Sequence, residues 1–279
     1  MGIKLLKYLR NLMIVALSLY VLLCVLMYIF QAKLLFHPQP KSIAETAVFL
    51  KQHPDFDTLC MPMEDQTRIS LFLSKKDSGR AKQPLVIYFG GNAEEVSHLA
   101  EYKAYFKSCM LALVNNRGFG RSSGEPSEKS MFSDALNIYD QLKDRPEIDP
   151  EQILVVGRSI GTGVATYLSS KRPVKATILI TPYESMIAVA QEKYPFVPIR
   201  PLIKHRFESE MYAASVATPV LAHIAKHDLV IPPAHAHALL KHWKGEHTFL
   251  ELDADHHSIM RNETAWKKTE EFIATHTKP

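Results

Sequence analysis

From Asp57 onward, short apolar runs alternate with longer segments of helical period, and this alternation restricts the possible folds more than any other feature of the sequence. Strand-like runs lie at 57–63, 68–74, 84–89, 110–115, 152–157, 176–181, 219–224 and 247–252, and helical segments at 93–107, 128–144, 160–171, 232–243 and 261–275. Only EDQT separates the first two runs, which predicts an antiparallel hairpin. The later strands alternate with helices, as in a parallel sheet covered on both faces. We therefore expect an α/β fold with a mostly parallel eight-stranded sheet.

The N-terminal segment is predicted to cross a membrane. Leu12 to Phe30 reads LMIVALSLYVLLCVLMYIF, and Ser18 is its only clearly polar residue. As a helix this run is about 28 Å long, close to the hydrocarbon thickness of a bilayer. A cleavable signal peptide is the alternative, but Phe30-Gln31-Ala32 is a poor cleavage site. Three cations precede the span and one follows it, which predicts a cytoplasmic N-terminus and places the rest of the chain on the outer, periplasmic or extracytoplasmic, side.

The chain is therefore divided into three parts. Residues 1–35 form the anchor, and 36–56 form a connecting segment with a surface helix at Ile43 to Gln52. Residues 57–279 form the α/β domain. Its irregular segment 182–217 is rich in proline and aromatic residues and is too long for a plain connection between a strand and a helix.

Charge and cysteine content exclude several classes of partner. The net charge of +4 resides in the first 36 residues, so the rest is close to neutral and is not expected to bind nucleic acid. Three cysteines are too few for a disulfide framework; Cys60 and Cys109 are expected to be buried, and one bridge between them stays open. No metal-ligand spacing is present, because His223-x-x-x-His227 lacks the glutamate of a zinc-hydrolase helix. We predict no metal and no cofactor.

The segment Gly157–Gly161 reads GRSIG and matches G-x-S-x-G. The pentapeptide alone is weak, since about one chain in ten of this length matches by chance. Its context is stronger, because ILVV predicts a strand before it and TGVATYL a helix after it. This arrangement exposes Ser159 as a nucleophile, and the helix N-terminus supplies the N–H of Ile160 to an oxyanion. The alternative is a glycine-rich turn with an N-capping serine.

A nucleophilic serine needs a base and an acid that orients the base. Asp228 follows the predicted strand 219–224, and His256 follows the last strand, so the chain order is Ser, Asp, His. Both lie where parallel strands end, the usual edge for a site. His257 is the second candidate base. Asp253 and Asp255 rank below Asp228 because they are so close to the histidines in sequence.

The loop after the third strand is a candidate oxyanion loop. It reads Gly90-Gly91-Asn92 and precedes a helical segment. The backbone N–H of Asn92, or that of Gly91, would complement the N–H of Ile160. The alternative is that the two glycines serve only the turn.

These stretches together resemble the α/β-hydrolase family over about residues 57–276, with a closer likeness to its small membrane-anchored serine hydrolases. The matching segments are GGNA at 90–93, NRGFGRSSGEPS at 116–127, GRSIGTGVA at 157–165, HDLVIP at 227–232, DHHS at 255–258 and QAKLLFHP after the anchor. Gly90 and Asp255 depart from the family, which usually has His and Gly there. The resemblance implies an α/β-hydrolase fold with 182–217 as its lid.

Within such a fold, two groups of side chains acquire expected roles. Arg117 would lie at the rim of the site, more as an ion-pairing residue than as a substrate ligand. The lid supplies four candidates for an apolar acyl pocket, with core packing as the alternative. They are Tyr183, Met186, Tyr194 and Phe196.

The sequence thus predicts a membrane-anchored serine hydrolase that cleaves a carboxylic ester or thioester with an acyl or lipid-like group. Ser159 attacks, His256 carries the proton and Asp228 orients the imidazole. One alternative is a serine aminopeptidase of the same fold, which needs an acidic residue near the site to hold the substrate amine. The candidates for that role are Glu94, Glu95 and Glu184. The other alternative is a catalytically silent, membrane-tethered interaction protein.

Overall fold

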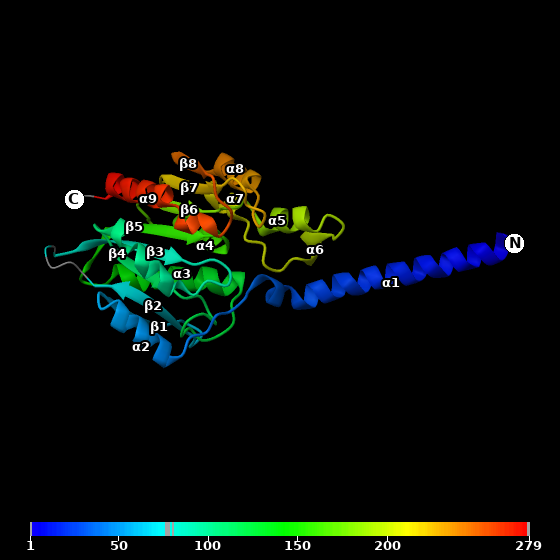
Figure 1. Ribbon diagram of the computed structural model, residues 1–279, viewed down its shortest axis with the longest axis horizontal. Helices are drawn as coiled ribbons and strands as arrows, with labels where there is room; N and C mark the ends of the chain where they lie inside the picture. The colour runs from blue at the N-terminus through cyan, green and yellow to red at the C-terminus, as the bar shows by residue number, and fades with distance from the viewer. Residues whose placement is uncertain (1, 76–78, 80, 278–279) are drawn as a thin grey trace.

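The computed structural model describes residues 2–75, 79 and 81–277, and within them the strands form one eight-stranded sheet in the order β1-β2-β4-β3-β5-β6-β7-β8 (Figure 1). The strands are β1 (Phe56–Pro62), β2 (Arg68–Ser74), β3 (Gln83–Phe89), β4 (Met110–Val114), β5 (Ile148–Arg158), β6 (Thr177–Ile180), β7 (Val220–Ala225) and β8 (His247–Leu252). β1 and β2 form an antiparallel hairpin, and β2 is also antiparallel to β4. The remaining neighbours are parallel. The predicted mostly parallel sheet is confirmed.

Helices cover both faces of this sheet. One face packs against α3 (Glu128–Lys143), α4 (Ile160–Lys171) and α8 (Pro233–His242). The other packs against α2 (Ile43–Gln52), the 3-10 helix η1 (Val96–Phe106) and α9 (Glu263–His276). Successive residues of the central strand β3 show why both faces are apolar: Ile87 joins the first core and Tyr88 the second. A strand buried on both sides places its carboxyl end, where a site can form, on a rigid support.

Some predicted boundaries and one burial prediction are corrected. The helix predicted at 93–107 begins only at Val96, after Glu95 caps its first turn through the N–H of Ser97. The prediction that Cys60 is buried was wrong: it is exposed on β1, the edge strand, which has no further strand beyond it. Cys109 is buried as expected, and among the described residues neither cysteine forms a disulfide.

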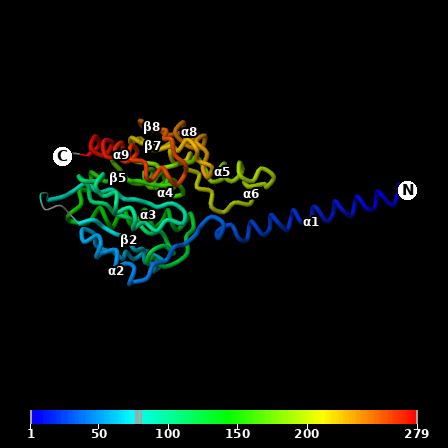
Figure 2. The backbone as a smooth tube through the Cα atoms, in the orientation of Figure 1, coloured from blue at the N-terminus to red at the C-terminus, as the bar shows by residue number. Residues whose placement is uncertain are grey.

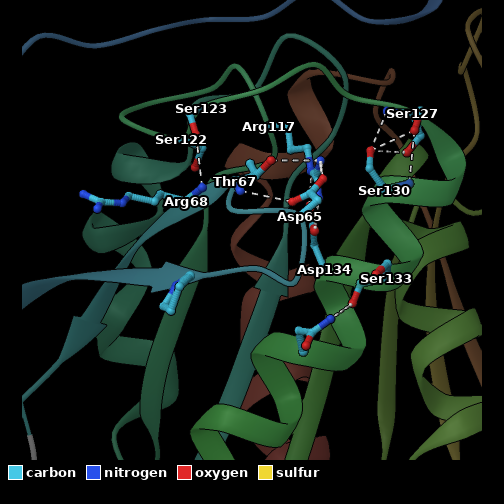
Figure 3. Close-up of polar contacts among 12 residues, drawn as sticks. Asp65, Thr67, Arg68, Arg117, Ser122, Ser123, Ser127, Ser130, Ser133 and Asp134 are labelled. Carbon is cyan, nitrogen blue, oxygen red and sulfur yellow. Dashed lines mark hydrogen bonds and ion pairs between the residues drawn. The ribbon is translucent and has the colours of Figure 1, made fainter.

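Arg117 fixes the loop 116–127 (Figure 3). Its guanidinium donates two hydrogen bonds to Asp134 of α3, at 2.8 and 2.7 Å. It also donates to Asp65 in the β1–β2 turn, which holds the pKa of that carboxyl at about 2. The predicted ion-pairing role of Arg117 is confirmed, because the side chain joins the loop to two separate elements.

The insertion 182–217 carries three short helices, α5 (Met186–Lys193), α6 (Ile199–Leu202) and α7 (Ser209–Ala213). Among the described residues, one helix, α1 (Gly2–Leu35), is long and apolar enough to cross a membrane. Most of α1 projects from the body, and its C-terminal end passes beside α5 and α6 (Figures 1 and 2). The sequence did not predict this contact between α1 and the segment 182–217.

Candidate active site

Ser159 stands on a sharp turn between β5 and α4. Its backbone has φ +50° and ψ −122°, a conformation that costs a non-glycine residue about 1–3 kcal/mol. The flanking glycines are required by space: a Cβ on Gly157 would lie 2.3 Å from the carbonyl oxygen of Gly161, and one on Gly161 would lie 2.2 Å from that of Phe89. The Ser159 side chain makes no capping hydrogen bond to α4, so the N-cap alternative was wrong. The turn holds the hydroxyl free for another partner.

That partner is His256. Its Nε2 lies 3.1 Å from the Ser159 Oγ, and its Nδ1 lies 2.7 Å from Oδ2 of Asp228. The other Asp228 oxygen accepts the backbone N–H groups of Val230 and Ile231, at 2.8 and 2.7 Å. All three side chains are buried. With both oxygens bonded, Asp228 is fixed and can hold the imidazole with Nδ1 protonated and Nε2 ready to accept the serine proton.

The rival residues at the end of β8 point elsewhere. His257 is exposed, and its ring lies edge-on to His256 with centroids 5.4 Å apart. Asp255 accepts the backbone N–H groups of His257 and Ser258, each at 2.8 Å. Asp253 lies 2.7 Å from His227. The structure therefore brings together the preferred residues of the sequence prediction and leaves the alternatives outside.

The loop after β3 approaches the serine closely. A Cβ built on Gly91 would lie 3.3 Å from the Cβ of Ser159. The Gly91 N–H, however, donates to the carboxylate of Glu94, so the prediction that Gly91 supplies an oxyanion donor was wrong. Asn92 lines the cavity with Ser159, and Ile160 is the first residue of α4, where N–H groups have no partner within the helix. Asn92 and Ile160 remain the candidate donors.

A buried ionic network beneath this loop was missed from the sequence. Glu94 accepts the hydroxyl of Tyr88 at 3.0 Å, and its carboxylate lies 3.1 Å from Arg158 and 3.2 Å from His98. Burial raises the pKa of Glu94, but the hydrogen bond from His98 and the charge of Arg158 lower it to about 2. Arg158 also donates to the backbone carbonyl of His256, at 3.3 Å. The only available signal was an arginine next to the nucleophile, in the variable position of G-x-S-x-G.

A cavity of about 260 Å³ leads to Ser159. Its walls come from the segment 182–217, from the loop after β7 and from the C-terminal end of α1, and the lining is mostly apolar. Met186 and Tyr194 line it, as the pocket prediction expected. Tyr183 instead packs in the core with no exposed surface, and Phe196 is 87% exposed outside the cavity. The acyl-pocket prediction was therefore right for two of its four residues.

The three glutamates considered for binding a substrate amine all have other partners. Glu94 accepts the N–H of Gly91, Glu95 pairs with Lys41 at 2.7 Å, and Glu184 hydrogen-bonds to His235 at 2.9 Å. Among the described residues, those that line the cavity include no carboxylate. A search of the same residues finds no group of three His, Cys, Asp or Glu side chains able to hold a metal ion.

Comparisons with known proteins identify the family and the fold. The family model described as dienelactone hydrolase family matches residues 116–277. An uncharacterized protein of Mycobacterium tuberculosis is 30% identical over 231 residues, which cover 81% of each chain. The lysophosphatidylserine lipase ABHD12 of Danio rerio is 30% identical over 178 residues, which cover 56% of this chain and 46% of that one. The solved structure of Est1E from Butyrivibrio proteoclasticus with ferulic acid bound has the same fold, with a TM-score of 0.66 at 16% identity over 78% of this chain and 98% of that chain. The chain belongs to the dienelactone hydrolase family and is a hydrolase with the α/β-hydrolase fold.

Proposed function

We propose that this chain is a membrane-anchored serine hydrolase that cleaves the carboxylic ester or thioester bond of an acyl or lipid-like substrate. One observation carries the proposal. Ser159, His256 and Asp228 form a continuous hydrogen-bonded chain at the end of an apolar cavity. A base within 3.1 Å of the hydroxyl of a serine on a strained turn is the arrangement that activates a nucleophile.

The reaction begins when Ser159 Oγ gives its proton to Nε2 of His256 and attacks the carbonyl carbon. The carbonyl oxygen takes the electron pair and is held by the N–H groups of Asn92 and Ile160. When the carbonyl reforms, the alcohol or thiol leaves with the proton from His256, and the acyl group stays on Ser159. Water then repeats the sequence and releases the acid. Asp228 stabilises the imidazolium in both halves.

The lining of the cavity supports an apolar acyl group. Leu34 and Leu35 come from α1, and Met186, Val189 and Ile199 come from the lid. The relative in Danio rerio is named a lysophosphatidylserine lipase, which gives precedent for ester cleavage in a lipid substrate. The cavity carries Lys193 but, within the described residues, no acid to hold a free amine, which disfavours the aminopeptidase alternative.

Anchoring through α1 rests on its length and composition. We place its N-terminus in the cytoplasm, because the lysines and arginine before the apolar run outnumber the single cation after it. The catalytic domain then lies on the outer side of the membrane.

Labelling with a fluorophosphonate tests the nucleophile. The full-length protein in detergent is expected to react, and Ser159→Ala is expected to lose the label while keeping its melting temperature. An unlabelled but folded wild-type protein would instead support the silent interaction protein. A panel of p-nitrophenyl esters against aminoacyl anilides tests the bond type: cleavage of the anilides alone would refute the esterase proposal.

A further inference from the structure

The anchor helix lies against the lid over a considerable length. The hydroxyl of Tyr20 donates to the carbonyl of Phe196 at the tip of the lid, at 2.8 Å. Near the other end, the Gln31 side chain donates to the Leu202 carbonyl at 3.1 Å and accepts the N–H of Lys204 at 2.6 Å. Between these contacts the interface is apolar, with Cys24 and Met27 packed against Ile187, Val197 and Ile199. From Tyr20 to Gln31 the contact extends about 16 Å along the helix.

This contact fixes the depth of the lid relative to the apolar run. Tyr20 lies about 15 Å inside the Phe30 end of the run Leu12 to Phe30, roughly half the hydrocarbon thickness of a bilayer. If that run spans the membrane, the lid tip lies within the leaflet. Shifting the span toward the N-terminus would avoid this, but it would place the three preceding cations in hydrocarbon, at a cost of up to about 2.5–3.5 kcal/mol for a cation at the centre of the span. The span centred on the apolar run is therefore favoured.

The surface around the cavity mouth suits immersion in lipid. Phe196 at the lid tip is 87% exposed, and Leu229, in the loop that follows β7, is 93% exposed. Tyr194 and Val230 line the cavity and are also exposed, at 41% and 44%. Exposed apolar side chains grouped around an apolar cavity mark an interaction surface.

The charged side chains of the lid are compatible with the same placement. Lys193 and Arg200 have stems long enough to bring their charges to lipid phosphates. The Lys204 ammonium lies 4.0 Å from the ring centroid of Tyr28 on α1, a favourable cation–π contact. Glu192 is paired with His235, at 3.0 Å. The side chains thus do not oppose contact with a leaflet.

The cavity itself reaches the same depth. Met27 and Tyr28 belong to the apolar run, and both line the cavity that leads to Ser159. A path from the lipid acyl region to the serine is therefore bounded by α1 on one side and the lid on the other. An acyl chain using this path would not cross water.

We propose that the α5–α6 lid is inserted in the leaflet beside α1, and that the cavity takes the acyl chain of a bilayer-resident lipid ester laterally, between α1 and the lid. The insertion rests on the anchoring of α1, and the substrate rests on the proposed ester hydrolysis at Ser159. The partner of this surface is the membrane leaflet, and the substrate class is an ester whose acyl chain lies in it.

Fluorescence quenching tests the insertion without relying on catalysis. Phe196→Trp and Phe249→Trp place a probe at two exposed phenylalanines, one at the lid tip and one on β8, which is remote from the lid. In vesicles of phosphatidylcholine brominated on the acyl chains, the probe at 196 is expected to be quenched at least threefold more than the probe at 249. Leu229→Trp is a second probe of the same surface. Trp243 and Trp266 are buried and give a constant background. Equal quenching at the lid and β8 probes would overturn the insertion.

Relative rates test the lateral path. Phe196→Glu is expected to lower the rate on a long-chain ester embedded in vesicles, relative to the rate on soluble p-nitrophenyl acetate, by at least tenfold. The matched variant Phe249→Glu should leave this ratio within twofold of wild type. A ratio unchanged by Phe196→Glu would overturn lateral delivery. If neither ester is cleaved by the wild type, the proposed hydrolysis fails, and with it the substrate assignment, while the quenching result still decides the insertion.

Discussion

Replacing Glu94 by glutamine should destabilise the protein strongly, although the residue does not line the cavity beside Ser159. The substitution removes the carboxylate that faces the buried guanidinium of Arg158 and leaves that charge uncompensated. Two routes give the size of the effect. The pKa of Glu94 is held at about 2 against an ordinary value of 4.5, a difference that corresponds to about 3 kcal/mol. Breaking a buried ion pair by removing one partner costs about 3–5 kcal/mol.

The pH dependence provides a separate signature of the same interaction. Because the folded-state pKa is lowered, the contribution of Glu94 is fully present above about pH 4.5, the unfolded value, and is lost as the pH falls toward 2. Wild-type stability should therefore decline through this window. In Glu94→Gln, the part of this decline in stability that comes from protonation of the Glu94 carboxylate should be absent.

Thermal unfolding of the full-length protein in detergent measures the effect. For a domain of this size, a loss of about 3 kcal/mol lowers the melting temperature by roughly 6–12 °C. Glu101→Gln, an exposed glutamate on the same helix η1, is the matched control and should change stability by less than about 0.5 kcal/mol. The double variant Glu94→Gln/Arg158→Met should lose less than the two single variants added together. A melting temperature of Glu94→Gln within 2 °C of wild type would refute the reasoning.

Three further predictions concern the site itself. Ser159→Gly should melt higher than Ser159→Ala, by a net stability of about 1 kcal/mol, because glycine adopts φ +50° without strain; a lower melting temperature would contradict a strained elbow. Asp228→Asn should reduce kcat on a p-nitrophenyl ester on the order of 10³–10⁴-fold with little change in KM, since the imidazole loses its orienting acceptor; a loss under tenfold would count against that role. His256→Ala should abolish turnover while His257→Ala stays within about threefold of wild type, and the opposite pattern would transfer the role of base to His257.

The parts of the fold that could be predicted are those that leave a local periodic pattern of apolar residues in the sequence. All eight strands and the β1–β2 hairpin follow from apolar runs and their spacing, because a buried parallel strand requires a continuous apolar segment. The positions of Ser159, Asp228 and His256 followed from the same pattern, since each comes directly after a strand and parallel strands end at one edge. The choice of His256 over His257 was made from position in the turn, and the exposure of His257 agrees with it.

Contacts between distant segments were not predictable in this way. The carboxylate of Glu94 was considered for substrate binding, but whether it meets solvent or Arg158 depends on how the loop after β3 packs on the turn after β5. The contribution of α1 to the cavity wall has no local sequence signal either, because an apolar run has the same sequence pattern whether it contacts lipid or protein. Exposure of Cys60 was missed for a related reason: an edge strand cannot be told from a central one by its own sequence.

Among the described residues, three of the five non-glycine residues with positive φ lie at the sheet edge where the proposed chemistry takes place. Ala93, Ser159 and Thr181 have φ values of +55°, +50° and +52°, and they follow the adjacent strands β3, β5 and β6. Such conformations persist only where surrounding packing determines them, at about 1–3 kcal/mol each. The sheet provides that packing: the N–H of Ser159 donates to the Ile180 carbonyl at 2.9 Å, and the N–H of Thr181 donates to the His223 carbonyl at 2.9 Å. The strands thus hold neighbouring turns in conformations that the turns would not adopt alone. One of these turns contains the proposed nucleophile Ser159, and another is the loop after β3 that faces it.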